Sequence, residues 1–246
     1  MAEVRKTALV TGSSSGIGFD VARAFLEADW NVVLNGRNET RLLDAARRLG
    51  RPERVAQVVG ATSDPATGEA MSRVALERFS GLDVLVNNAG EFGTKPFLEV
   101  TGADLDHYLE VNLKGTYFTT QAAVRAMTAQ KRGGSIVSIT TVLIDHAIGW
   151  VQASAPLVTK GAIRALTILL AGELAAQNIR VNAVAPGFIR TPLMDGADPA
   201  PLAATALLRR IGSVEDISAA VLYLAQSSYV TGHVLNVDGG FVTARS

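Results

Sequence analysis

The sequence predicts a single α/β domain (residues 1–246), built on a doubly wound parallel sheet of about seven strands with helices on both faces. Short β-branched runs alternate with longer helical patterns along all 246 residues, and this order implies right-handed crossovers between parallel strands. Most of the short runs are continuously apolar, which is typical of strands covered on both faces. No linker-like segment and no internal repeat interrupts the alternation, so one domain is expected.

Each expected element follows from its local pattern. The expected strands are the short apolar runs Thr7–Thr11, Asn31–Asn35, Arg54–Val59, Val84–Asn87, Ser135–Ile139, Arg180–Ala185 and His233–Val237. The expected helices are the longer segments between them, Gly16–Ala28, Asn38–Leu49, Ala66–Phe79, Asp104–Gln130, Ala155–Gln177 and Val214–Ala225.

Two of these helices, 104–130 and 155–177, are longer than a crossover requires and carry apolar residues on more than one face. The second apolar face indicates either an interface with a symmetric partner chain or a single thick core. The segment 191–210 is punctuated by Pro192, Pro199 and Pro201, and we expect it to form a small lid.

Composition excludes several classes of protein. The 23 Lys and Arg residues balance 23 Asp and Glu residues, which argues against a dedicated nucleic-acid binder. The chain has no cysteine, so thiol nucleophiles, disulfides and zinc–thiolate sites are excluded, and no metal site is expected. No apolar run approaches the roughly 18 residues of a membrane span, and no secretory segment is visible. We therefore expect a cytoplasmic protein that binds neither nucleic acid nor a membrane.

A glycine-rich turn predicts a nucleotide site. The first strand runs directly into Thr11-Gly-Ser-Ser-Ser-Gly-Ile-Gly18 and then into an amphipathic helix. Glycines permit a tight turn and close approach of the backbone to a diphosphate, while the helix N-terminus offers free N–H groups to the anion. The candidate diphosphate-binding residues are Gly12, Ser14, Ser15, Gly16, Ile17 and Gly18.

The end of the second strand bears on the choice of cofactor. An acidic residue there favours NAD, through the ribose 2′-OH, whereas a cation favours the 2′-phosphate of NADP. The sequence reads Asn35-Gly-Arg37, with no carboxylate and with Arg37 at the end. We expect NADP(H) to be preferred and NAD(H) to be possible, although Arg37 in a merely solvated position is the alternative.

Several motifs in a fixed order carry a resemblance to a known family. These are Thr11–Gly18, Asn87-Asn-Ala-Gly90, Asn112, Lys160, Arg180–Gly187, Arg190-Thr-Pro192, Tyr229–Gly232 and Asp238-Gly-Gly240. On these motifs the chain resembles the short-chain dehydrogenases/reductases, of the kind that includes the 3-oxoacyl-carrier-protein reductases. The resemblance implies a Rossmann-type fold, a nicotinamide cofactor, hydride transfer between a carbonyl and an alcohol, and commonly a homotetramer.

The resemblance also implies roles for single residues. It places Asn112, Thr141 and Lys160 in the catalytic site. It places the cofactor along Asn88, Ala89 and Gly90, with Lys160 holding its ribose and the backbone of Thr62 near its adenine. It places the carboxamide end of the cofactor beside Pro186, Gly187, Ile189 and Thr191.

The chain departs from the family pattern at three places. The family serine after the fifth strand is replaced by Thr141, which keeps a hydroxyl, and the acid after the third strand is replaced by Ala61. The family tyrosine, four residues before the lysine, is replaced by Pro156, and no tyrosine occurs between Tyr117 and Tyr223. A positioned general acid contributes roughly 10²–10⁴ in rate, so this last departure bears directly on chemistry.

Three groups are candidates to replace the missing phenol. Lys160 could pass protons through water, with Asn112 supporting the chain. Ser154 stands at the entrance of the predicted helix, where N-capping is the favoured interpretation. His146 has an imidazole that can exchange a proton, and Asp145 beside it either modulates this histidine or faces solvent.

The sequence therefore supports an NADP(H)-dependent oxidoreductase with an altered active site. The alternatives are a nucleotide-binding pseudoenzyme that serves as a sensor or scaffold and, on weaker grounds, a lyase, isomerase or epimerase.

Overall fold

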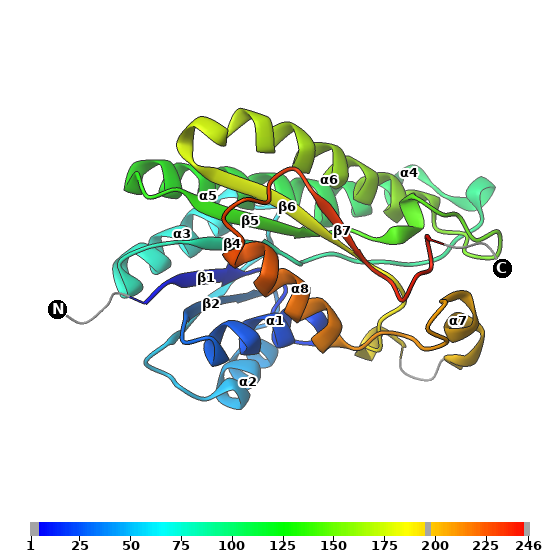
Figure 1. The fold of residues 1–246 in the computed structure, drawn as a ribbon, viewed down its shortest axis with the longest axis horizontal. Coiled ribbons are helices and arrows are strands. Elements are labelled where there is room, and N and C mark those ends of the chain that lie inside the picture. Colours follow the sequence, from blue (N-terminus) through cyan, green and yellow to red (C-terminus); the bar gives the residue numbers. More distant parts are fainter. Residues whose placement is uncertain (1–4, 195–197, 244–246) are drawn as a thin grey trace.

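The computed structural model of the protein describes residues 5–194 and 198–243. It contains a seven-stranded parallel sheet in the order β3-β2-β1-β4-β5-β6-β7 (Figure 1). The strands are β1 Thr7–Val10, β2 Asn31–Gly36, β3 Val55–Val59, β4 Val84–Asn87, β5 Gly134–Ile139, β6 Ile179–Pro186 and β7 Val234–Val237. The expected fold class is confirmed, and the seven expected strands agree with the observed bounds to within one residue.

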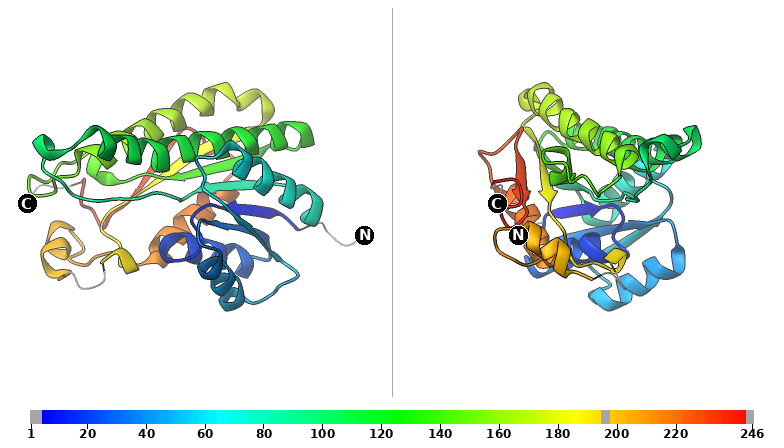
Figure 2. Two further views of the ribbon diagram at one scale, coloured as in Figure 1. Left: turned by 180° about the vertical axis from the view of Figure 1, so that it is seen from behind. Right: turned by 90° about the vertical axis from the view of Figure 1, so that its right-hand side faces the viewer.

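Helices cover both faces of the sheet (Figures 1 and 2). One face carries α1 Gly16–Glu27, α2 Glu39–Leu49 and α8 Val214–Gln226. The other carries α3 Pro65–Phe79, α4 Gly102–Tyr108, α5 Gly115–Gln130 and α6 Ser154–Glu173. The short helix α7 Ala200–Thr205 lies beyond the carboxyl ends of the strands, together with the 3₁₀ turn η5 Pro192–Met194.

Separate apolar clusters fill the two sides of the sheet. Phe25, Leu34 and Val221 belong to the cluster that includes residues of α1 and α8, and all three are almost fully buried. Met71 and Met127 belong to the cluster that includes residues of α3 and α5, and both are completely buried. Every residue of β1, β2 and β4 is buried, and this burial on both faces accounts for the mostly apolar sequences of these strands.

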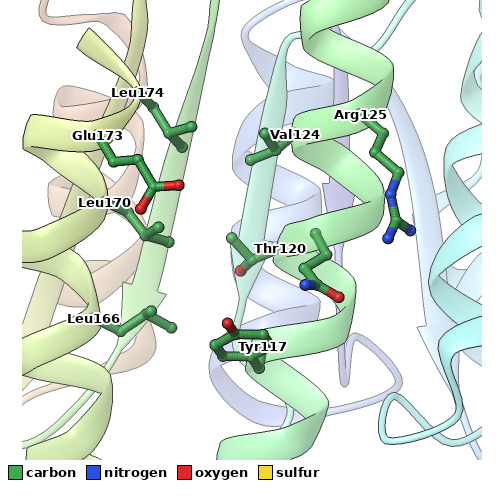
Figure 3. A pocket seen from close by; sticks show the side chains of 9 residues that line it. Tyr117, Thr120, Val124, Arg125, Leu166, Leu170, Glu173 and Leu174 are labelled. Atoms are coloured by element: carbon green, nitrogen blue, oxygen red, sulfur yellow. The ribbon is translucent and has the colours of Figure 1, made fainter.

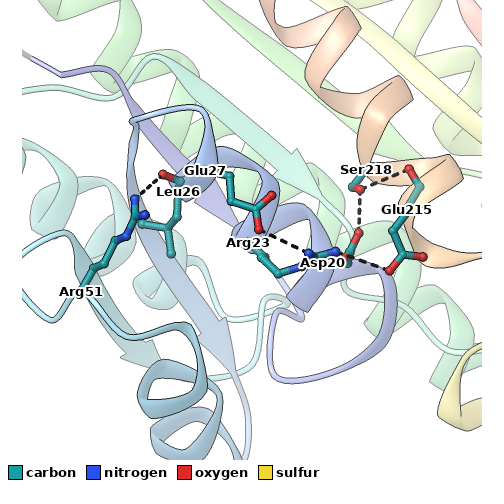
Figure 4. A network of polar contacts seen from close by, with 7 residues as sticks. All are labelled: Asp20, Arg23, Leu26, Glu27, Arg51, Glu215 and Ser218. Atoms are coloured by element: carbon teal, nitrogen blue, oxygen red, sulfur yellow. Dashed lines mark hydrogen bonds and ion pairs between the residues drawn. The ribbon is translucent and has the colours of Figure 1, made fainter.

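A buried carboxylate joins α1 to α8 (Figure 4). Asp20 on α1 is 3% exposed and accepts hydrogen bonds from Ser218 Oγ at 2.6 Å and from Arg23 Nε at 2.9 Å. Arg23 also pairs with Glu27 and with Glu215 on α8. These contacts fix α1 on the sheet, and the N-terminus of α1 is the end that the glycine turn enters.

Two expectations about the helices are corrected. The single helix expected over Asp104–Gln130 is interrupted by a π-helical segment, η2 Leu109–Lys114, between α4 and α5. The expected cap Ser154 is instead the first residue of α6, because the first helical hydrogen bond runs from Leu157 N to the carbonyl of Ala153. Pro156 still lies in the first turn, where its missing N–H leaves no intrahelical bond unmade.

Helix α6 is apolar enough, with a hydropathy of 1.3, and long enough to cross a membrane by these two criteria alone, which the sequence analysis did not anticipate. In the structure it packs against β6, α4 and η2, as a helix of the α/β fold. In the expected lid, η5 and α7 are observed, while residues 195–197 lie outside the described residues.

Candidate active site

A cavity of about 450 Å³ opens at the carboxyl edge of the sheet, where the loops after β1, β2, β3 and β4 converge. Open parallel sheets bind ligands at this edge. The cavity is lined by Gly12, Ser14, Ser15, Asn35, Gly36, Arg37, Gly60, Ala61, Thr62, Ser63, Ala89, Gly90, Glu91, His107, Glu110 and Val111. The predicted cofactor residues in this lining are Gly12, Ser14, Ser15, Arg37, Thr62, Ala89 and Gly90.

The glycine turn is clasped to the loop after β4. Gly12 has a φ of +61°, and a Cβ at this position would lie 2.8 Å from the Cα of Ala89, so only glycine fits. The hydroxyl of Thr11 accepts from the backbone N–H groups of Asn88 and Ala89, both at 3.0 Å. The Asn88 amide donates to the carbonyls of Thr11 and Gly12, also at 3.0 Å. The Asn88 side chain therefore holds the turn and is not part of the cavity lining.

Ser13 is a positioning residue that the sequence analysis missed. It is fully buried, its backbone N–H donates to the carbonyl of Asn35 at 2.9 Å, and its Oγ accepts from Asn35 N at 3.0 Å. The Asn35 amide donates in turn to the carbonyls of Val58 and Gly60, both at 3.1 Å. The ends of β1, β2 and β3 are thus tied together beneath the cavity.

The π-helical segment carries Asn112, whose side chain is held from two directions by Glu91 and Thr159. Asn112 is completely buried, its Oδ1 accepts from the backbone N–H of Glu91 at 2.7 Å, and its Nδ2 donates to the Glu91 carbonyl at 3.0 Å. Nδ2 also donates to Thr159 Oγ1 at 3.0 Å. Thr159 on α6 is buried as well and donates to the carbonyl of Pro156 at 2.7 Å. The sequence analysis missed Thr159 because only the tertiary fold brings it to Asn112.

Lys160 lies next to Asn112. A Cβ at Gly90 would lie 3.1 Å from both Lys160 Nζ and Asn112 Oδ1, so both polar groups face the backbone of the Asn-Ala-Gly loop. The ammonium donates to the carbonyl of Ile139 at 2.8 Å. Burial lowers the pKa of Lys160 to about 8, because the charged form loses hydration. The amine can therefore hold or release a proton near neutral pH.

Thr141 lies two residues beyond the carbonyl of Ile139 that binds Lys160. Its hydroxyl accepts from Leu143 N at 3.3 Å and so caps the 3₁₀ turn Val142–Ile144. Because this contact uses a lone pair, the hydroxyl proton stays available for a substrate oxygen.

The other candidate proton donors have contacts of their own. The ring of His146 packs edge-on against Phe241, with centroids 5.0 Å apart. Asp145 pairs with Arg164, which takes the carboxylate that was considered as a modulator of His146. Ser154 and Pro156 line a separate cavity of about 160 Å³.

After β6 the chain passes close to Asp238 and then comes near the glycine turn at Thr191. Pro186 ends β6, and a Cβ at Gly187 would lie 2.9 Å from the Cα of Asp238. Thr191 approaches Gly16, since a Cβ there would lie 3.8 Å from Thr191 Cβ. The buried side chain of Ile189 belongs to the core cluster around α1 and α8, and the partly buried side chain of Ile17 packs against that cluster.

Arg37 forms an ion pair that the sequence analysis did not foresee. Its Nη2 lies 2.6 Å from Oε1 of Glu91, and the second carboxylate oxygen lies 2.7 Å from Nε2 of His107. Arg37 is therefore ion-paired, while 63% of its side chain stays exposed to solvent, as the alternative interpretation expects.

The chain is similar to known proteins over nearly its whole length. A family model described as enoyl-(acyl carrier protein) reductase matches residues 12–242. The chain is 36% identical over 242 residues to a 3α-hydroxysteroid dehydrogenase of Mediterraneibacter gnavus, covering 95% of this chain and 96% of the relative. It is also 36% identical over 246 residues to the 3-oxoacyl-(acyl-carrier-protein) reductase FabG of Thermotoga maritima, covering 96% and 98% of the two chains.

Solved structures give the same result. A short-chain type dehydrogenase/reductase from Mycobacterium marinum superposes with a TM-score of 0.92 at 33% identity, covering 98% of each chain. The structure of ElxO with NADP bound superposes with a TM-score of 0.90 at 28% identity, covering 98% of this chain and all of that one (100%). With the Rossmann-type sheet, the glycine turn and the family match over nearly its whole length, the chain belongs to the short-chain dehydrogenase/reductase family and is an oxidoreductase of that type.

Proposed function

We propose that the protein is an NADP(H)-dependent oxidoreductase that transfers a hydride between the nicotinamide and a carbonyl or alcohol substrate. The observation that carries the proposal is the placement of Lys160 Nζ and Asn112 Oδ1 against Gly90, at the edge of the cavity entered by the glycine turn. The relatives named as dehydrogenases and reductases, and the NADP-bound structure of ElxO, support it.

The chain offers the groups that a dinucleotide requires. The cavity joins the backbone of Gly12, Ser14 and Ser15 at the N-terminus of α1 with a cation, Arg37, at the end of β2. Backbone N–H groups at a helix N-terminus favour a diphosphate, and a guanidinium favours a 2′-phosphate. The bound cofactor supplies the hydride, and these residues bind and orient it.

The proposed active site lacks the family phenol, whose place is taken by Pro156. We assign the proton transfer to Lys160, directly or through water, because its lowered pKa of about 8 suits exchange near neutral pH. Thr141 donates its free hydroxyl proton to the substrate oxygen. Asn112, fixed by Glu91 and Thr159, keeps the backbone beside Lys160 in place.

The test is turnover of NADPH over a panel of carbonyl substrates, with binding of NADPH and NADH followed by fluorescence and thermal shift. We expect Lys160→Ala to lose roughly 10²–10⁴ of the rate while its melting temperature stays close to that of the wild type. Reduction should decline as pH rises through about 8, because the protonated amine is the donor. Lys160→Arg, which stays protonated, should lose this limb of the profile.

The second candidate is a nucleotide-binding pseudoenzyme, and Pro156 is the observation that favours it. A positioned acid accounts for about 3–5 kcal/mol of barrier lowering, so its loss without a substitute would leave a protein that binds but does not turn over. Saturable NADPH binding with no oxidation on any substrate would support this candidate and contradict the first.

We also propose that the protein is a cytoplasmic homodimer or homotetramer, assembled through α5 and α6. Ile168 and Leu169 on α6 are 54% and 68% exposed, which leaves an apolar stripe without a partner in the monomer. A cavity of about 260 Å³ lies between the two helices, with leucines of α6 facing Val124 and Tyr117 of α5 (Figure 3). A two-fold interface would cover this surface.

A further inference from the structure

A charged bridge crosses the cavity that we assign to the dinucleotide. Arg37 follows β2 and Glu91 follows β4, and β1 lies between these two strands in the sheet. The ion pair between Arg37 Nη2 and Glu91 Oε1, 2.6 Å apart, therefore spans the carboxyl end of β1, from which the glycine turn leaves. Both residues line the same cavity as Gly12, Ser14 and Ser15.

The Glu91 carboxylate is held by two partners. One oxygen contacts Arg37, and the other lies 2.7 Å from His107 Nε2. Burial raises the pKa of Glu91, but hydrogen bonds from His107 and Arg37 outweigh this effect, so the pKa lies below its usual range. At neutral pH the Glu91 carboxylate is therefore ionised, and its negative charge lies against Arg37, a cation of the same cavity.

The main chain of Glu91 is fixed and cannot move the carboxylate away from Arg37. Asn112 accepts from its N–H at 2.7 Å and donates to its carbonyl at 3.0 Å, so residue 91 is clamped at both main-chain groups. The pair can therefore open only by rotation of the Glu91 side chain or of the exposed Arg37 side chain.

We infer that Glu91 is a specificity-determining residue, whose carboxylate competes with the 2′-phosphate of NADP(H) for Arg37. The inference rests on the proposed function. A 2′-phosphate has to displace the carboxylate from the guanidinium or bind beside it against repulsion of like charge. NAD(H) has no group that requires this exchange. Glu91 thus lowers the preference for NADP(H) over NAD(H) that Arg37 alone would give.

The test uses 2′,5′-ADP and 5′-AMP, which differ only in the 2′-phosphate, in binding titrations with the wild type, Glu91→Gln, Arg37→Ala and the double variant. An exposed ion pair is worth up to about fivefold in affinity. We expect Glu91→Gln to tighten 2′,5′-ADP by about that factor and to leave 5′-AMP unchanged. In the Arg37→Ala background the gain from Glu91→Gln should disappear, because the residues act as a pair.

The matched control is Glu110→Gln. Glu110 lines the same cavity, but its carboxylate pairs with Lys114 at 2.7 Å instead of with Arg37. We expect its loss to change neither titration. If Glu91→Gln and Glu110→Gln strengthened the binding of 2′,5′-ADP equally, the effect would come from the net charge of the cavity, and the inference would be overturned. Weaker binding of both probes to Glu91→Gln would overturn it too, by making Glu91 a ligand of the nucleotide.

Thermal melts establish that each variant is folded. If Glu91→Gln does not fold, Glu91→Asp is used in its place, because its side chain is one methylene shorter and holds the carboxylate farther from Arg37. It should tighten 2′,5′-ADP in the same direction and by less. If the wild type binds NADPH and NADH but the selective gain is absent, the inference alone fails. If it binds neither dinucleotide, the proposed function fails and the inference fails with it.

Discussion

Pro156 occupies a position at which a tyrosine would add a second proton donor to the proposed active site. It lies in the first turn of α6, and its carbonyl accepts from Thr159. That hydrogen bond involves the main chain of residue 156, so any side chain there can keep it. The helix therefore does not depend on residue 156 being proline.

We expect Pro156→Tyr to raise carbonyl reduction by about 10², because a phenol one helical turn before Lys160 returns a general acid to the face that carries the amine. Steady-state rates with NADPH measure this gain. Pro156→Phe supplies the same ring without the hydroxyl and should show no gain. Equal rates for the tyrosine and phenylalanine variants would place the proton path elsewhere.

Between elements, the contact of η2 with α6 is made by a few buried polar groups. Asn112 and Thr159 form the hydrogen bond that joins them, and both side chains are inaccessible to water. A buried polar group that loses its partner costs more than the net value of an ordinary hydrogen bond.

Thr159→Val should therefore lower the free energy of unfolding by about 1–3 kcal/mol, because it leaves one N–H of Asn112 and the Pro156 carbonyl without that partner. Urea denaturation measures the change. Thr159→Ser retains the hydroxyl and should recover most of the loss. If valine and serine give the same stability, the contact between η2 and α6 does not depend on this bond.

The elements themselves were largely predictable, since strand order and burial follow from apolar runs and turn residues. The helix expected from Ala66 begins at Pro65, where the preceding Asp64 accepts from Ala66 N as an N-cap. The failures have tertiary causes. Ser154 has the composition of a cap, but the chain is already helical there. Glu91, Ser13 and Thr159 matter only through partners distant in sequence, and no local pattern marks such residues.

For the whole molecule, the proposed assembly is the property that α6 most directly controls. Leu169→Glu places a charge in the proposed interface, where burying it without a partner is costly. We expect the variant to sediment as a smaller species than the wild type at equal concentration. Leu43→Glu, on α2 at the opposite face of the sheet, is the matched control and should leave the mass unchanged. A monomeric wild type would disprove this assembly.

The π-helical segment makes the orientation of Asn112 sensitive to chain length. Such a turn contains an extra residue relative to a regular helix. Deleting Leu113 or Lys114 would leave a continuous helix, but it would rotate the preceding part, which includes Asn112, by about 100° relative to α5. Asn112 would then turn away from Glu91 while α5 stayed packed. A scaffold of this kind can lose or acquire a polar group through an indel, without exchanging a single amino-acid type.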